Sequence, residues 1–128
     1  MKIKIDLADT FFSRFIRLRD RKCMRCGSTV KLNELLEPIS HECSHYWSRG
    51  KEGTRFEPDN CDTLCYGCHN LWGHGDERDK YKEFKIKQLG QRRFDTLQLQ
   101  AFTYCKKDRT MSAIICKAMF KDLRDKLL

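Results

Sequence analysis

The sequence has little proline and no long apolar run. Only two prolines occur among its 128 residues, and it contains no repeat or low-complexity tract. No stretch reaches the roughly 18 apolar residues that a membrane-spanning helix requires. Charged residues follow the first methionine closely, so we expect no secretory signal peptide. The length suits one domain, and we expect a single domain over residues 1–128.

Negative charge is also in deficit. The formal net charge is +8, the aromatic content is 11%, and the apolar residues are periodic enough to exclude a disordered chain. Both flanks are basic, whereas the central Cys/His-rich part is mildly acidic. A metal centre between basic flanks suits a phosphate backbone that lies across it. This balance favours a polyanion such as DNA as the partner, and no membrane.

Cysteine, by contrast, is abundant. The eight cysteines are Cys23, Cys26, Cys43, Cys61, Cys65, Cys68, Cys105 and Cys116. Without a secretory signal, metal binding is a better interpretation than a disulfide framework. Two Cys-x-x-Cys turns, Cys23–Cys26 and Cys65–Cys68, offer four thiolates to a tetrahedral structural Zn²⁺, and a redox motif would not explain two such pairs. Cys105 and Cys116 lie in helical patterns, and we expect both to be small buried apolar residues.

The middle of the chain indicates a hairpin followed by a helix. Residues 41–48 have the aromatic content of a strand. Residues 49–56 contain two glycines and are typical of a hairpin loop, and a second turn follows at residues 58–60. A helix can begin near Leu64 and run to about Trp72, where glycines end it.

Helices are predicted at both ends. Asp9 or Thr10 can cap a helix that runs to about Arg21. Three helical segments close the chain, the first over residues 77–89. The last segment carries an apolar stripe formed by Met111, Ile114, Ile115, Ala118, Met119, Leu123 and Leu127. We expect this stripe to pack within the molecule, while a homodimer formed through the C-terminal helices, or an adaptor that docks another protein there, is the alternative.

Three polar residues, His45, Asn60 and His69, occur in an order that resembles that of HNH nucleases. His69 directly follows the second Cys-x-x-Cys turn. The matching segments are Cys43-Ser44-His45-Tyr46, Pro58-Asp59-Asn60 and Leu64-Cys65-Tyr66-Gly67-Cys68-His69-Asn70, which are similar to those of phage and prophage HNH proteins. The stretch Phe12–Asp20 resembles the NinG-like recombination group of that family. The resemblance covers roughly residues 9–90.

The resemblance implies an α+β fold. It consists of a small ββα-metal motif over residues 23–76, braced by the four-cysteine zinc site, with an N-terminal helix before it and a helical extension over residues 77–128 after it. It also implies a metal-dependent DNA endonuclease in the cytoplasm of a bacterial host or phage-infected cell, leaving 5′-phosphate and 3′-hydroxyl ends. One active site cuts one strand, so we expect nicking.

The resemblance also assigns roles. His45 would be the general base that activates water, a role that suits an imidazole. Asn60, on or after the second strand, would hold the hairpin loop and orient His45. His69 would bind the catalytic ion, and His74 could add a second ligand if the helix end curls back at Gly73.

One position departs from the family pattern. Many members carry Asp or His just before the base, as a metal ligand, whereas this chain has Ser44, whose hydroxyl is a poor ligand. Cys43, His41, His74 or water can fill the gap, and the ion can be Mg²⁺, Mn²⁺, Ni²⁺ or Zn²⁺. The departure motivates an alternative function, a non-catalytic zinc module that binds DNA or branched junctions.

Several basic residues are candidates for DNA contact. Arg49, Lys51 and Arg55 lie in the loop between the two expected strands, which should face the same side as His45. A second set, Lys80, Lys82, Lys85, Lys87, Arg92 and Arg93, follows the zinc-braced part of the chain. Together they predict salt-dependent binding, mainly to the phosphate backbone.

Overall fold

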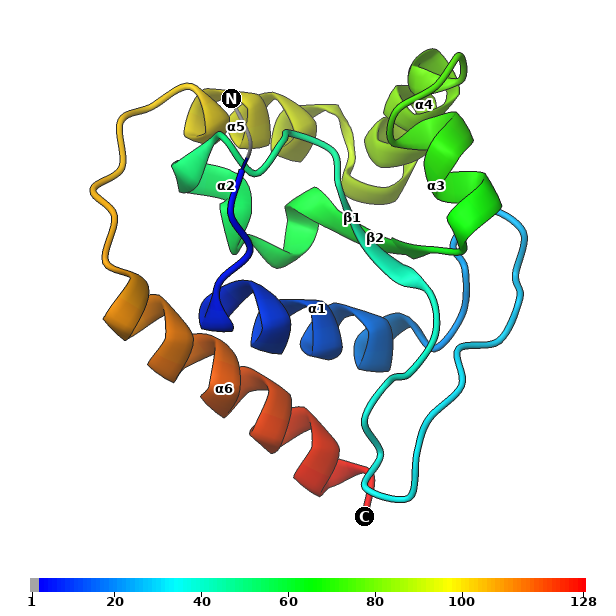
Figure 1. The fold of residues 1–128 in the computed structure, drawn as a ribbon. Helices are drawn as coiled ribbons and strands as arrows, with labels where there is room; N and C mark the ends of the chain where they lie inside the picture. Colours follow the sequence, from blue (N-terminus) through cyan, green and yellow to red (C-terminus); the bar gives the residue numbers. More distant parts are fainter. Residues whose placement is uncertain (1–2) are drawn as a thin grey trace.

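The computed structural model describes residues 3–128. Two short antiparallel strands form a hairpin, and helices cover it on both sides (Figure 1). The elements are α1 (Leu7–Asp20), β1 (Glu42–His45), α2 (Glu52–Arg55), η1 (Pro58–Asn60), β2 (Cys61–Leu64), α3 (Tyr66–Trp72), α4 (Arg78–Leu89), α5 (Gln91–Ala101) and α6 (Arg109–Lys126). The α+β class and the flanking helices are confirmed. Among residues 3–128, no helix combines the length and apolar character needed to cross a bilayer.

The register of the hairpin directs its two faces to different helices. His45 lies opposite Cys61, and Ser44 lies opposite Asp62. Because side chains alternate along a strand, neighbouring positions face opposite sides. Cys43 and Cys61 accordingly pack with the apolar side of α1, while the Asp62 carboxylate meets α4. The hairpin therefore lies between α1 and α4.

The first helix begins earlier than the sequence predicts. Its N-cap is Asp6, whose carboxylate accepts from the Asp9 backbone N–H, while the Asp9 carboxylate accepts from the Asp6 backbone N–H. The prediction of Asp9 or Thr10 as the cap was wrong because Asp9 is the second partner of this capping box. The helix ends as expected at Arg21, which adopts a left-handed conformation with φ 60°.

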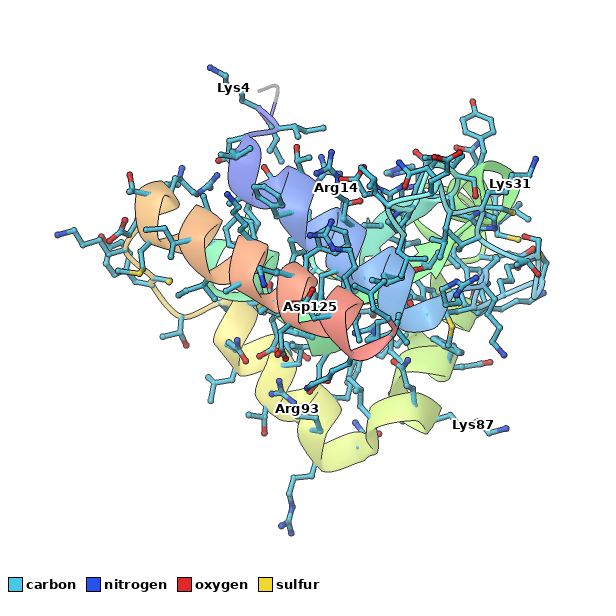
Figure 2. All side chains as sticks on the ribbon, turned by 90° about the horizontal axis from the view of Figure 1, so that it is seen from below. Lys4, Arg14, Lys31, Lys87, Arg93 and Asp125 are labelled. Atoms are coloured by element: carbon cyan, nitrogen blue, oxygen red, sulfur yellow. The ribbon has the colours of Figure 1, made fainter. Side chains whose placement is uncertain are left out.

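The last helix packs against α1 mainly through residues outside its predicted stripe, although Met119 of the stripe lies against the same core. Figures 1 and 2 show α6 running alongside α1. Its buried residues are Cys116 and Phe120, whereas Ile114 is 59% exposed. The prediction failed because α6 has apolar residues on more than one face, and periodicity alone does not say which face meets α1. Cys105 is likewise exposed, in the link before α6, and not buried in a helix.

Helix α4 is fixed to the hairpin by a buried ion pair. The Lys85 Nζ atom lies 3.0 Å from the Asp62 carboxylate, and both side chains are fully buried. The Tyr81 hydroxyl donates to the same carboxylate oxygen at 3.0 Å, and the Gln88 amide donates to the other at 3.0 Å. Lys85 is therefore a structural residue, and its expected place in a surface lysine stripe was wrong. Lys87, in contrast, projects outward (Figure 2).

Candidate metal centre and catalytic cavity

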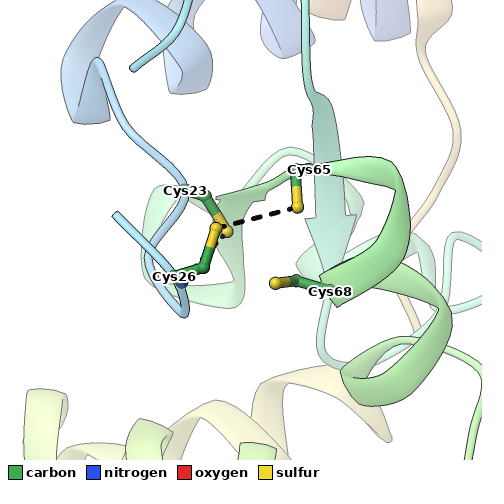
Figure 3. A group of neighbouring side chains, drawn as sticks. All are labelled: Cys23, Cys26, Cys65 and Cys68. Carbon is green, nitrogen blue, oxygen red and sulfur yellow. Dashed lines mark hydrogen bonds between the residues drawn. The ribbon is translucent and has the colours of Figure 1, made fainter. Parts of the chain in front are cut away.

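Four cysteine sulfurs converge at one side of the hairpin. Cys23 and Cys26 lie in the turn after α1, Cys65 is the N-cap of α3, and Cys68 lies in the first turn of that helix (Figure 3). All four sulfur atoms lie within 4.8 Å of one another, and those of Cys26 and Cys65 are 3.9 Å apart. Four thiolates at this spacing are a donor set that a structural metal such as zinc prefers. The four predicted ligands are thus brought together.

The surroundings of this cluster shift the pKa values of its thiols in opposite directions. The Arg25 guanidinium donates to the Cys68 sulfur at 3.4 Å. The Ser28 hydroxyl, 3.4 Å from the Cys26 sulfur, lowers the pKa of that thiol to about 6. Burial, together with the neighbouring thiols, raises the pKa of Cys68 to about 12. Several thiolates this close together repel each other, and a cation bound between them would allow all four to ionise.

A separate cavity of about 600 Å³ brings the predicted histidines together. His45 reaches it from the end of β1, His69 from α3, and His74 from the turn after α3. Its lining is Ile3, Glu42, Cys43, His45, Tyr46, Trp47, Ser48, Arg49, Lys51, His69, Gly73, His74 and Arg78. A strand histidine and a helix histidine therefore face the same space.

His45 is held in one orientation and one tautomer. Its Nε2 atom lies 2.9 Å from the backbone carbonyl oxygen of Arg55. Because a carbonyl oxygen only accepts, Nε2 carries the proton, and Nδ1 is the unprotonated nitrogen. The ring also lies against Phe12, with centroids 6.0 Å apart. Burial lowers the pKa of His45 to about 4, so the imidazole is neutral at physiological pH.

Asn60 holds the loop between the strands and makes no side-chain hydrogen bond to His45. Its Nδ2 atom donates to the carbonyl oxygens of Trp47 at 2.9 Å and Thr54 at 3.1 Å, and its Oδ1 atom accepts from the Trp47 N–H at 2.9 Å. The side chain is fully buried. Asn60 ends η1 and precedes β2, whereas the sequence placed it on or after that strand. The expected hairpin loop also contains the short helix α2, which ends at Arg55.

His69 lies between a carboxylate and a second imidazole. Its Nδ1 atom is 3.4 Å from the Glu42 carboxylate, and its ring centroid is 4.6 Å from that of His74. Burial lowers the pKa of His69, which keeps the ring neutral as a metal ligand requires. A Cβ at position 73 would overlap this ring, so Gly73 leaves the room that the imidazole occupies. His74 directly follows Gly73, and its ring lies beside that of His69.

The three loop residues predicted to contact DNA divide into two groups. Arg49 and Lys51 line the cavity, on the same side as His45. Arg55 is only 4% exposed, and its guanidinium donates to both oxygens of the Asp9 carboxylate at 2.9 and 2.5 Å. Its predicted DNA contact was wrong, because a guanidinium committed to a buried carboxylate is not available to phosphate. Arg93 is also engaged, in ion pairs with Glu57 and Asp59.

Comparison with models of known protein families gives a match. The family model described as NinG, Bacteriophage Lambda NinG protein, matches residues 2–125. The chain belongs to the NinG family. No curated protein and no solved structure gave a match. The match includes α5 and nearly all of α6, so the C-terminal helices belong to the NinG unit, although the sequence resemblance ended near residue 90.

A second group of donor atoms in this NinG-family protein lies in the apolar core. Donor atoms of Cys43, His45 and Cys61 fall within 4.8 Å of one another. Burial raises the pKa of Cys61 well above its usual value, so this sulfur stays protonated at neutral pH. Both cysteines pack with Phe12 and Ile16 as small apolar residues. This group fits packing better than metal binding.

The sequence did not reveal the roles of two residues: Glu42, which lines the cavity, and Asp9, which binds Arg55. Glu42 was passed over because its place, three residues before His45, matches no family ligand position. Asp9 was interpreted only as a helix cap, and its pairing with Arg55 joins positions far apart in the chain. For Glu42, the available signal was an acidic residue directly after His41, which is itself a candidate ligand in the sequence. The sequence offered none for the second.

Proposed function

We propose that this protein is a metal-dependent HNH endonuclease that hydrolyses DNA phosphodiester bonds and nicks one strand per active site. The observation that carries the proposal is that His45 on β1 and His69 on α3 line one cavity. A hydrolase of this kind needs a base for water and an electrophile for the phosphate at the same place. In this proposal His45 is the base for water, and His69 holds the cation that acts as the electrophile.

His45 is suited to the role of general base. Its Nε2–H is bound to the Arg55 carbonyl, so Nδ1 is free to accept a proton from water. A pKa of about 4 keeps the ring unprotonated but makes it a weak base. A bound phosphate would place negative charge nearby and oppose this lowering of the pKa.

The charge of the cavity suits a DNA backbone. Arg49, Lys51 and Arg78 are among its lining residues. Arg78 is held in place by its bond to the Tyr46 carbonyl oxygen at 2.9 Å, and Lys51 lies 4.2 Å from the centre of the Phe102 ring. Positively charged side chains fixed around a cavity attract phosphate and make binding depend on salt. We therefore propose DNA as the partner.

His69 and His74 are the residues that would hold a catalytic cation. Both rings border the cavity, and their centroids are 4.6 Å apart. A divalent ion at such a site neutralises charge on the phosphate and on the leaving oxygen. The chain's own part is to keep the His69 imidazole neutral and close to that of His74, and to keep His45 at the same cavity.

The test is cleavage of supercoiled and branched DNA by the zinc-loaded protein with added Mg²⁺ or Mn²⁺. The proposal expects nicking that EDTA stops and that His69→Ala lowers strongly, with DNA binding retained. A protein that binds DNA but cuts neither substrate with any of Mg²⁺, Mn²⁺, Ni²⁺ or Zn²⁺ would overturn the nuclease. That result would support the alternative of a non-catalytic zinc module, which Ser44 in place of an acidic ligand favours.

A further inference from the structure

The cavity contains an acidic side chain whose role the family pattern does not supply. At the position just before the base, where an acidic ligand is common in the family, Ser44 is fully buried, and its hydroxyl has no hydrogen-bond partner within residues 3–128. It is not among the residues that line the cavity. The serine therefore does not offer its oxygen to a cation there.

Other candidates for the missing ligand are engaged elsewhere. Both ring nitrogens of His41 are occupied, one by the Ser28 hydroxyl and the other by the Ser40 hydroxyl, each at 2.9 Å. Cys43 borders the cavity, but it is only 6% exposed and packs with the core on the α1 side of the hairpin. Neither residue is placed to complete a site with His69.

Glu42 reaches the cavity instead. It opens β1, two residues before Ser44, and its side chain is 46% exposed. One carboxylate oxygen lies 3.4 Å from the Nδ1 atom of His69. Two ligands that each lie about 2.1 Å from one ion are separated by roughly 3.0 Å in octahedral and 3.4 Å in tetrahedral geometry. The two atoms are thus as far apart as neighbouring ligands of one cation.

The charge of the cavity makes a bare carboxylate there unfavourable for DNA binding. Among the described residues that line it, Glu42 is the only acidic one, and Arg49, Lys51 and Arg78 are the cationic ones. A carboxylate that faces a phosphate repels it, whereas a carboxylate with a divalent ion carries a net positive charge and attracts it. The position of Glu42 is therefore explained if a cation is bound.

We propose that Glu42 is the carboxylate ligand of the catalytic cation, together with His69. The inference rests on the proposed endonuclease function and assigns Glu42 the role that the family pattern gives to the residue at Ser44. A carboxylate oxygen with the imidazole nitrogens of His69 and His74, and water in the remaining positions, suits Mn²⁺ or Mg²⁺. Gly73 supports this pair because it leaves the space in which the His69 ring lies beside Glu42.

The test measures Mn²⁺ binding directly, by the loss of the free-ion EPR signal when Mn²⁺ is added to the zinc-loaded full chain. The parent protein is expected to bind one Mn²⁺, Glu42→Asp to retain binding, and Glu42→Gln to lower the affinity by roughly tenfold or more. Glu83→Gln, at an exposed position on α4, is the matched control and should bind as the parent does. Zinc content and circular dichroism establish that each variant is folded.

The outcomes separate this inference from the nuclease proposal. Equal Mn²⁺ affinity in the parent and in Glu42→Gln, or no Mn²⁺ binding by the parent, overturns the ligand role of Glu42 whether or not the protein cuts DNA. Mn²⁺ binding that depends on Glu42, in a protein that does not nick DNA, upholds the ligand and overturns the nuclease. Loss of both Mn²⁺ binding and nicking in Glu42→Gln alone supports both.

Discussion

The Nε2 atom of His45 donates to the backbone carbonyl oxygen of Arg55 across 2.9 Å, and this contact fixes which ring nitrogen is free. The carbonyl is itself held in place, because the Arg55 side chain is anchored by Asp9 on α1 and by the Lys4 and Arg49 carbonyl oxygens. The candidate base therefore depends on a helix that does not border it in sequence. This arrangement joins the stability of the loop to the geometry of the cavity.

The Asp9–Arg55 pair makes a prediction about acid stability. Burial alone would raise the pKa of Asp9, but the hydrogen bonds from Arg55 outweigh it and lower the pKa below the ordinary value of 3.8. A lowered carboxyl pKa gives stability that is complete above the unfolded pKa and is lost as pH falls through the folded one. Asp9→Asn keeps an oxygen for the capping box but removes the charge, and should cost about 3–5 kcal/mol at pH 7.

Urea unfolding of the parent and Asp9→Asn at several pH values measures this effect. The difference in unfolding free energy should be largest near neutral pH and shrink below about pH 4. Asp76→Asn, at an exposed position, should match the parent at pH 7. A difference that stays constant down to pH 3 would show that the charge of Asp9 is not what stabilises the loop.

The buried Lys85–Asp62 pair predicts a large loss of stability from a conservative change in volume. Lys85→Met removes the cation and leaves the Asp62 carboxylate buried with its two neutral donors, Tyr81 and Gln88. The expected cost is about 3–5 kcal/mol in the free energy of unfolding. Lys82→Met, at an exposed position on the same helix, should change it by less than about 0.5 kcal/mol. Equal effects in chemical denaturation would refute the structural role of Lys85.

The cysteine cluster predicts that metal and fold are lost together. Metal analysis of the purified protein should find close to one zinc per chain, and Cys65→Ser should lose both the zinc and the cooperative unfolding transition. Cys105→Ser is the control, because that thiol is exposed and lies outside the cluster. A folded Cys65→Ser protein without zinc would contradict the structural metal site.

Much of the metal centre follows from the sequence because its signal is local. Each Cys-x-x-Cys turn places two sulfurs together whatever the rest of the fold does, so only the meeting of the two turns needed the structure. The hairpin and α3 were predictable for a similar reason, since strand composition and glycines mark where each begins and ends. The order of His45, Asn60 and His69 then indicated one shared site.

The errors come from contacts between distant positions. Arginine is usually an exposed residue type, yet Arg55 is buried because its guanidinium pairs with Asp9, far away in the chain. Lys85 belongs to a lysine-rich helix, and only the register of β2 reveals that Asp62 meets it. Apolar residues on several faces of α6 left its packing face undetermined until α1 was in place. No local pattern encodes these pairings.

The most direct measurement of the central claim is the rate at which the zinc-loaded protein nicks a supercoiled plasmid in the presence of Mn²⁺, compared between the parent and His45→Ala. His41→Ala is the matched control, because that ring is bonded to Ser28 and Ser40 and does not line the cavity. Removal of the base should lower the nicking rate by about 10²- to 10⁴-fold, with DNA affinity and zinc content unchanged, while His41→Ala stays close to the parent. Nicking by His45→Ala at the parental rate would contradict the account.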